Sequence, residues 1–169
     1  MSKVICYTKL HLPENYDENS WYFELFSKPL ESQDNVGYVG NGLLRELRRS
    51  KITPSSEALD FVIIAMSVVS ADKAILRRNS PDGWTRQINL EIPLQKAEEW
   101  EKVKDKLEKM LRFLSGDFWK LTFTQLPESI ALDNFTEDRD KDCVCLLSGG
   151  MDSLVGGIDL CEYGKKPLF

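Results

Sequence analysis

Two segments near the start of the chain alternate apolar with polar positions, as strands with one buried face do. They cover residues 3–12 and 21–26, and the turn-rich stretch 13–19 separates them. We predict that they form two antiparallel strands. We then predict a loop that holds Gly37, Gly40 and Gly42, followed by a short helix, indicated by Leu43, Leu44 and Leu47, that ends before Thr53.

The following pattern is helical, with apolar residues recurring at helical spacing from Leu59 to Val69. Thr53 and Pro54 have the character of an N-cap and a first helical residue, and the helix is predicted to run to about Arg77. Apolar residues also fill much of the opposite face. We therefore expect this helix to be central and mostly buried.

Beyond a turn at 79–83, residues 88–94 alternate again and predict a strand with one wet face. An apolar stripe from Ala97 to Leu114 then predicts an amphipathic helix with Gly116 as its C-cap, and residues 119–123 predict another half-buried strand. This mixed order of strands and helices indicates an α+β domain over residues 1–126. The acidic, apolar-poor stretch 127–142 is predicted to be an exposed linker, and residues 143–169 to open a further domain.

Composition narrows the function classes. The 169 residues are 42% apolar, enough for a core, and the net charge of −5 argues against a dominant nucleic-acid-binding surface. The longest apolar stretch, 61–69, is too short to cross a bilayer, which takes about 20 residues. Since the first residues do not resemble a secretory signal, we expect a cytoplasmic protein without membrane contact. The spacing of the four cysteines, at 6, 143, 145 and 161, predicts no metal site.

A charged cluster is expected at the end of the central helix, made of Asp72, Lys73, Arg77 and Arg78. One interpretation is an ionic cluster that faces a substrate, a nucleotide or the second domain. The simpler interpretation is favourable charge at a helix C-terminus, and we prefer it.

The most specific chemistry lies in the last part of the chain. Residues 143–147 are continuously apolar, as expected of a parallel strand covered on both faces, and the strand should end at Ser148. Gly149 and Gly150 permit unusual backbone angles and let amide groups approach phosphate oxygens. Apolar residues over 154–160 then predict a helix whose N-terminus points its N–H donors at the same place. A strand, a glycine loop and a helix in this order make an anion cradle.

The side chains of the loop suit a nucleotide. Ser148 and Ser153 can donate hydroxyl hydrogen bonds to phosphate, and Asp152 can cap the helix or orient a Mg²⁺ ion carried by the nucleotide. No Gly-Lys-Ser/Thr follows, so this is not a Walker A loop. The alternative is a plain Gly-Gly turn with Asp152 as N-cap, but the complete order of elements favours phosphate binding. The predicted ATP-binding residues are Ser148, Gly149, Gly150, Met151, Asp152 and Ser153.

This six-residue run resembles the SGGxDS signature of the PP-loop ATP pyrophosphatases, which activate a carbonyl or carboxylate oxygen with AMP and release pyrophosphate. Extended by Leu154, it is similar to the 7-cyano-7-deazaguanine synthases of the QueC family. The segments at 71–73, at Trp84 and at 113–119 resemble the N-terminal extension of QueC-like proteins from bacterial anti-phage islands, the QatC type of the Qat system.

The resemblance implies an open parallel α/β domain that uses ATP and Mg²⁺ to adenylate a 7-deazaguanine-type substrate, with a partner protein of a defence operon as an acceptor. Only one strand, one helix and the start of a second strand at 167–169 belong to that domain here. The zinc-binding cysteine cluster of QueC relatives has no counterpart positions, and we do not expect this chain alone to be catalytic. The alternative is a non-catalytic protein-binding module with a vestigial or truncated loop.

Overall fold

The computed structural model describes residues 2–8, 17, 19–28, 34–126, 130 and 141–169. The chain divides into two compact units, residues 1–134 and 135–169, which are considered separately below. Most of the predicted linker 127–142 lies outside the described residues. The predicted domain boundaries at 126 and 143 therefore stay predictions.

The first unit is built on a five-stranded parallel sheet with the order β3-β2-β1-β4-β5. Its strands are β1 (Ser2–Thr8), β2 (Ser20–Leu25), β3 (Val36–Val39), β4 (Gln87–Leu94) and β5 (Phe118–Gln125). The prediction that the first two strands are antiparallel is wrong, since β1 and β2 pair in parallel from Lys3 with Ser20 to Thr8 with Leu25. Alternation tells which residues share a face of a strand, but not in which direction the neighbouring strand runs. Residues 9–12 of the first predicted strand lie outside the described residues.

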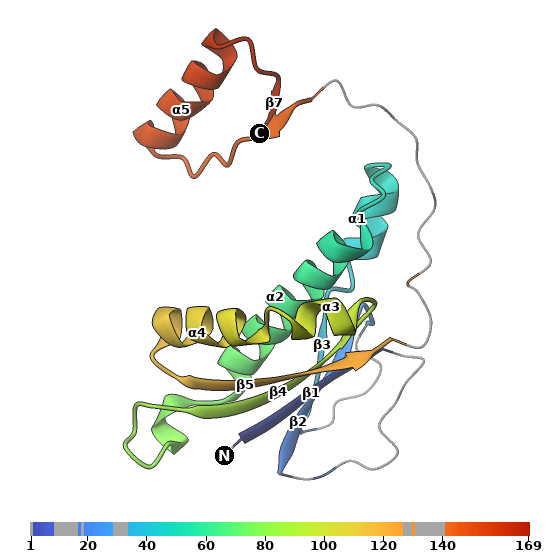
Figure 1. Cartoon of the computed structure of the whole chain (residues 1–169), viewed down its shortest axis with the longest axis vertical. Coiled ribbons are helices and arrows are strands. Elements are labelled where there is room, and N and C mark those ends of the chain that lie inside the picture. The colour runs from blue at the N-terminus through green and yellow to red at the C-terminus, as the bar shows by residue number, and fades with distance from the viewer. Residues whose placement is uncertain (1, 9–16, 18, 29–33, 127–129, 131–140) are drawn as a thin grey trace. The chain divides into compact units, whose positions relative to one another are not determined.

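The helices of this unit lie together on one side of the sheet (Figure 1). They are α1 (Leu43–Arg49), α2 (Ser56–Ala74), α3 (Ala97–Glu101) and α4 (Lys104–Ser115), with a 3₁₀ turn, η1 (Arg77–Asn79). The predicted helix over 97–114 is therefore two helices. Gly116 is the predicted C-cap, with a left-handed φ of 75° that explains why glycine stands there.

The start and the burial of α2 correct two predictions. Its N-cap is Ser55, whose Oγ accepts from the Ala58 amide at 3.2 Å, so the helix begins after Thr53 and Pro54, and it ends at Ala74 before Arg77. One face enters the core, but Phe61 and Val69 on the other are 55% and 52% exposed. The core lies between this layer and the sheet and includes Val4, Cys6, Leu59, Ile63, Ile64, Ile88, Leu90, Ile92, Leu111, Trp119 and Leu121.

A buried ionic network joins the start of β4 and β5 to the end of α2. Asp117 is fully buried and accepts from both guanidinium nitrogens of Arg77, at 3.0 and 2.9 Å, and from Arg86 Nη2 at 2.6 Å. Arg86 also donates to Asp72 Oδ1 at 2.5 Å. Two members of the predicted cluster, Asp72 and Arg77, thus serve the fold of this unit. Lys73 and Arg78 are exposed.

A second buried carboxylate binds the backbone that follows the carboxyl end of β4. Asp60 of α2 is fully buried and accepts from the backbone amides of Gln95 and Lys96, each at 2.9 Å, and from the Trp100 indole at 3.2 Å. Gln95 and Lys96 directly precede α3, and the side chain of Lys96, its N-cap residue, makes no capping hydrogen bond. Asp60 instead accepts from the backbone where the chain enters this helix. Through these bonds Asp60 joins α2 to the turn after β4.

The second unit has the predicted order of strand, loop, helix and strand. Its elements are β6 (Cys143–Val144), α5 (Met151–Glu162) and β7 (Pro167–Leu168), and the two strands pair in parallel. The predicted strand over 143–147 is too long, because β6 ends at Val144. The prediction that residues 143–147 are covered on both faces is wrong within this unit, because Val144 and Leu146 are 70% and 85% exposed. One helix cannot cover both faces of a parallel strand pair. No helix among the described residues is long and apolar enough to span a membrane.

Candidate phosphate-binding loop

The loop between β6 and α5 takes its shape from Gly149. This residue has a left-handed φ of 82°, which residues with a side chain adopt only at a cost. A Cβ at Gly149 would meet nothing within 4 Å, and one at Gly150 would lie 3.6 Å from Ser148 Oγ, an ordinary contact. The chain itself thus needs glycine at 149 for its backbone angle, and the space above both glycines is open.

The two serines of the predicted site lie against each other. Ser148 Oγ and Ser153 Oγ are 3.2 Å apart, and the Ser148 amide donates to Ser153 Oγ at 3.3 Å. Ser153 Oγ in turn donates to the Gly150 carbonyl at 2.8 Å. These contacts fold residues 148–153 into one turn at the N-terminus of α5, with both hydroxyls on it.

Asp152 does not cap the helix, which corrects one of its two predicted roles. The N-cap position is Gly150, and no side chain accepts from the first turn. Asp152 is exposed, in the second position of α5. Because the first amides of a helix have no intrahelical partner, the N–H groups of this turn stay available to an anion, and the helix dipole favours negative charge there.

The residues present fit phosphate, and Asp152 fits a phosphate-bound Mg²⁺. Mg²⁺ is usually held by one or two carboxylates together with the phosphates of a nucleotide, and Asp152 offers one carboxylate beside the amides. Among the described residues, no group of three or more His, Cys, Asp or Glu could hold a metal ion by itself.

A mostly apolar cavity of about 460 Å³ lies in the same unit, beside α5. Its lining includes Leu147, Leu154, Ile158 and Phe169. Phe169 packs directly on Gly157, where a Cβ would lie 2.8 Å from the ring carbon Cε1. The sequence reasoning missed this role of Gly157, because only the folded unit brings β7 and α5 together.

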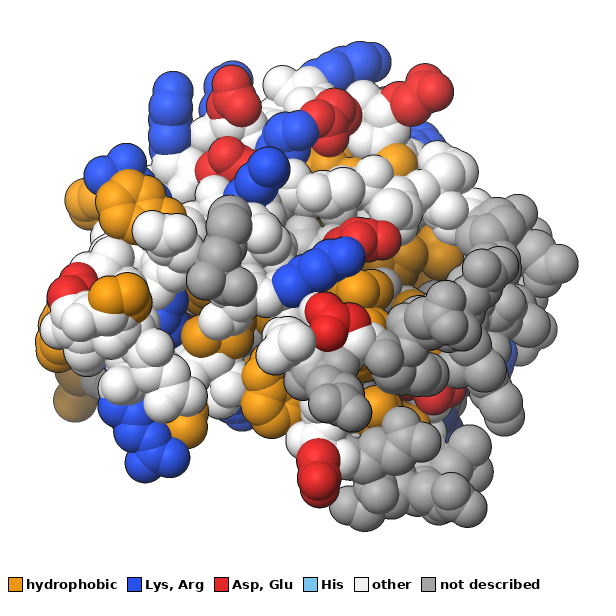
Figure 2. All heavy atoms as spheres, turned by 90° about the horizontal axis from the view of Figure 1, so that it is seen from below, with side chains coloured by type: hydrophobic (Ala, Val, Ile, Leu, Met, Phe, Trp, Pro, Cys, Tyr) orange, Lys and Arg blue, Asp and Glu red, His pale blue; other side chains and the backbone are white. Residues whose placement is uncertain are grey.

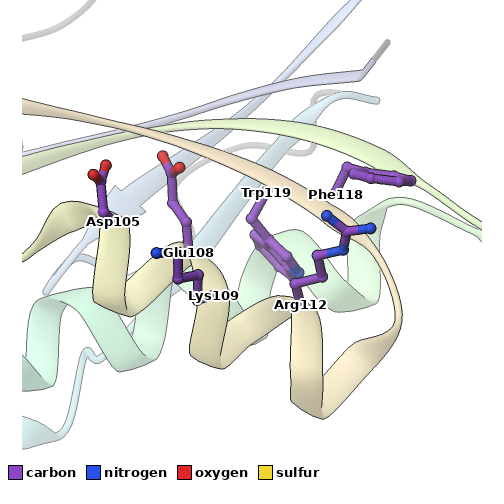
Figure 3. Close-up of a pocket in the computed structure, with 6 residues that line it drawn as sticks. All are labelled: Asp105, Glu108, Lys109, Arg112, Phe118 and Trp119. Carbon is purple, nitrogen blue, oxygen red and sulfur yellow. The ribbon is translucent and has the colours of Figure 1, made fainter.

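A separate groove of about 190 Å³ lies between α4 and β5 of the first unit (Figure 3). Arg112 stacks over the Phe118 ring at 4.4 Å, and Glu108 accepts from the Leu121 amide on the open edge of β5 at 2.8 Å. Both charged groups are engaged in holding the helix to the strand. The groove therefore shows how an edge strand is covered.

No family profile, no curated protein and no solved structure matches this chain. The fold and the loop are therefore interpreted from their own residues. The resemblance to PP-loop enzymes stays a prediction from the motif.

Proposed function

We propose that residues 148–153 bind the triphosphate of ATP, and that the protein uses ATP to adenylate a substrate oxygen and release pyrophosphate. The observation that supports this most is the turn itself. Gly149 is held in a left-handed conformation, and Ser148 and Ser153 are paired at a helix N-terminus that no side chain caps. Open amides, two hydroxyls and a helix dipole suit a polyphosphate.

In the proposed adenylation, the residues of the loop would act on the negative charge of the leaving group. When a substrate oxygen attacks the α-phosphorus, negative charge shifts to the leaving pyrophosphate. The amides of the first turn and the hydroxyls of Ser148 and Ser153 would stabilise that charge. Mg²⁺ would neutralise part of the phosphate charge, and Asp152 is the residue that would hold it.

The substrate and the partner are proposed from the resemblance alone. We propose a 7-deazaguanine-type substrate, an anti-phage role in the cytoplasm, and transfer to a partner protein. In this proposal the first unit is an accessory domain. The exposed apolar residues Val144 of β6 and Leu146, which follows it, would be covered by further elements of an α/β sheet.

A non-catalytic protein-binding module is the second candidate. Its support is the first unit's exposed apolar side chains, because Phe113, Leu114 and Trp84 are 88%, 71% and 69% exposed. Large exposed apolar groups of this kind mark protein interfaces. In this case the loop would be vestigial.

The test is pyrophosphate release from ATP by a protein in which this chain is joined to the strands and helices that complete its second sheet. Ser148→Ala and Asp152→Ala should each lower release by about 100-fold or more, the usual effect of removing a preorganised charge-stabilising group. Asp159→Ala, an exposed carboxylate later in the same helix, is the matched control and should leave release unchanged. Unchanged turnover in Ser148→Ala and Asp152→Ala would contradict the proposal. A stable product that never releases pyrophosphate but binds a partner would favour the module.

A further inference from the structure

Helix α2 carries an uncharged row of residues on the side that points away from the core. Phe61 and Val69 are 55% and 52% exposed, and Ala65 between them is exposed as well. Residues four apart lie above one another on a helix, so these three form a continuous row. Apolar residues on all sides are typical of a helix that is buried on all sides. The described residues of the first unit cover the other side of α2 and leave this row open.

The row differs from the scattered apolar side chains of an ordinary protein surface, which need no partner. Figure 2 shows a face of the ordinary kind, where hydrophobic side chains lie among basic and acidic ones. On α2, by contrast, three successive turns of one helix carry uncharged residues in line. The aromatic member is also held in place, because the Phe61 ring stacks on the Trp100 ring with centroids 6.3 Å apart. Aromatic residues are enriched at the centres of protein interfaces.

The two ends of the row carry opposite charges. Glu57 lies one turn before the row and Lys73 one turn after it, and both side chains are exposed. Glu57 also pairs with Lys96 of its own chain through Oε1, but a carboxylate has further acceptor sites on its two oxygens. Along the helix the order is therefore acidic, aromatic, alanine, aliphatic and basic, with Ala65 at the centre.

This order is complementary to its own reverse. A two-fold axis beside Ala65 brings Phe61 of one copy against Val69 of the other. At each end it brings Glu57 of one copy against Lys73 of the other, so that every contact is made twice. Helices that pack along rows of residues four apart cross at about −50°, and a small residue at the crossing lets their backbones approach closely. A parallel arrangement would instead bring like charges together at both ends, which is unfavourable.

We propose that this row is the interface of a homodimer, in which a second copy of the chain packs its own α2 antiparallel to the first. The row with its ends consists of Glu57, Phe61, Ala65, Val69 and Lys73. The interface belongs to the first unit and does not depend on nucleotide binding. One pair of helices makes a small interface, and small interfaces are weak and transient, so we expect a Kd of about 10–100 μM.

Sedimentation equilibrium of the 169-residue chain over about 5–500 μM measures this Kd. Ala65→Glu should weaken the dimer by about tenfold or more, because it places two carboxylates side by side at the two-fold axis. Thr122→Glu is the matched control and should leave the Kd unchanged. It adds the same group at an exposed position of β5, on the face of the sheet opposite to the buried Leu121.

A charge swap tests the antiparallel direction. Lys73→Glu should weaken the dimer by about fivefold, because the new carboxylate faces Glu57 of the second copy. Adding Glu57→Lys to Lys73→Glu should restore the Kd to within about twofold of the original, since opposite charges then meet again. Lys109→Glu, at an exposed position of α4, changes the net charge equally and should leave the Kd unchanged.

Unfolding midpoints measured by tryptophan fluorescence show whether each variant keeps its fold. If Ala65→Glu does not fold, Lys73→Glu and its rescue still decide the question. A chain that stays monomeric at about 500 μM would overturn the proposal. A dimer that a folded Ala65→Glu variant leaves unchanged would do the same, as expected if the exposed apolar residues of the second unit joined the copies. A charge swap that fails to restore the dimer would overturn the antiparallel pairing. Ala65→Glu should leave Mg·ATP binding by the phosphate loop intact, so the two proposals can fail separately.

Discussion

Replacing Asp117 with Asn should destabilise the first unit more than any surface substitution. The carboxylate is fully buried and accepts from Arg77 and from the backbone and side chain of Arg86. Arg86 is itself only 3% exposed and also donates to the carbonyls of Asp72 and Ile75, each at 2.8 Å. Asn keeps the shape of the side chain but removes the charge and turns one acceptor into a donor that faces other donors.

The expected loss of unfolding free energy in Asp117→Asn follows from the cost of an uncompensated buried charge. Without the Asp117 carboxylate, the guanidinium of Arg86 keeps the two backbone carbonyls, but among the described residues its remaining ion pair is with Asp72, a side chain that is 54% exposed. Breaking a buried pair in this way costs about 3–5 kcal/mol, a large share of the roughly 5–15 kcal/mol that stabilises a typical domain. Asp105→Asn, on the exposed side of α4, is the matched control and should change stability by no more than about 0.5 kcal/mol.

Urea unfolding followed by tryptophan fluorescence measures this directly, because all four tryptophans lie in the first unit. The contribution of the Asp117 carboxylate to the free energy of unfolding should also depend on pH. Burial by itself would raise the pKa of Asp117, but the hydrogen bonds from Arg86 outweigh burial and hold that pKa below its usual value. The carboxylate therefore stabilises the fold above an unfolded-state pKa of about 3.9, and this contribution is lost as the pH falls through the lower folded-state pKa. Equal midpoints for Asp117→Asn and Asp105→Asn would refute the reasoning.

Three further outcomes are expected. Asp60→Ala should lower the free energy of unfolding by about 2–4 kcal/mol, because it leaves two half-buried backbone amides and the Trp100 indole N–H without their acceptor, and urea unfolding beside Asp105→Asn measures the loss. Gly116→Ala should lower the free energy of unfolding by about 1–2 kcal/mol, because position 116 has a left-handed φ. Gly83 also has a positive φ but lies in an exposed turn, so the loss measured for Gly83→Ala tests whether the end of α4 adds to that cost. Burial raises the pKa of Cys6 to about 12, so iodoacetamide at pH 8 should label the exposed Cys161 and spare Cys6 in the folded protein; rapid labelling of Cys6, read by peptide mass spectrometry, would show that the sheet opens.

Local patterns predicted most elements of the first unit, and failed where partners distant in the sequence decide. The prediction of a loop around Gly37 is wrong, because residues 36–39 form β3 by pairing with β2. Alternation identified β4 and β5, and a glycine identified the end of α4. The direction of β2 could not be read from alternation, which is the same in parallel and antiparallel sheets. Thr53 and Ser55 are both good caps by type, and only the helix geometry selects Ser55. The Arg86–Asp117 pair joins residues 31 positions apart, so no local pattern announces it.

The candidate loop was predictable because it is local. The strand, the glycines, the hydroxyls and the helix follow one another within residues 143–162. The structure places Ser148 and Ser153 together at the N-terminus of this helix. The contact of Phe169 with Gly157 could not be foreseen, because it forms only when the end of the chain folds back onto α5.

Nucleotide binding by the loop tests the central claim most directly. Mg·ATP is titrated into the 169-residue chain while the backbone amides of Gly149, Gly150 and Ser153 are followed by NMR. We expect saturable shifts confined to the loop and the first turn of α5, and their loss in Gly149→Ala, because the left-handed φ at position 149 disfavours a side chain. Gly156→Ala, in open space within α5, should bind like the original chain. Loop amides that do not respond to Mg·ATP, or an unchanged response in Gly149→Ala, would contradict the phosphate-binding assignment.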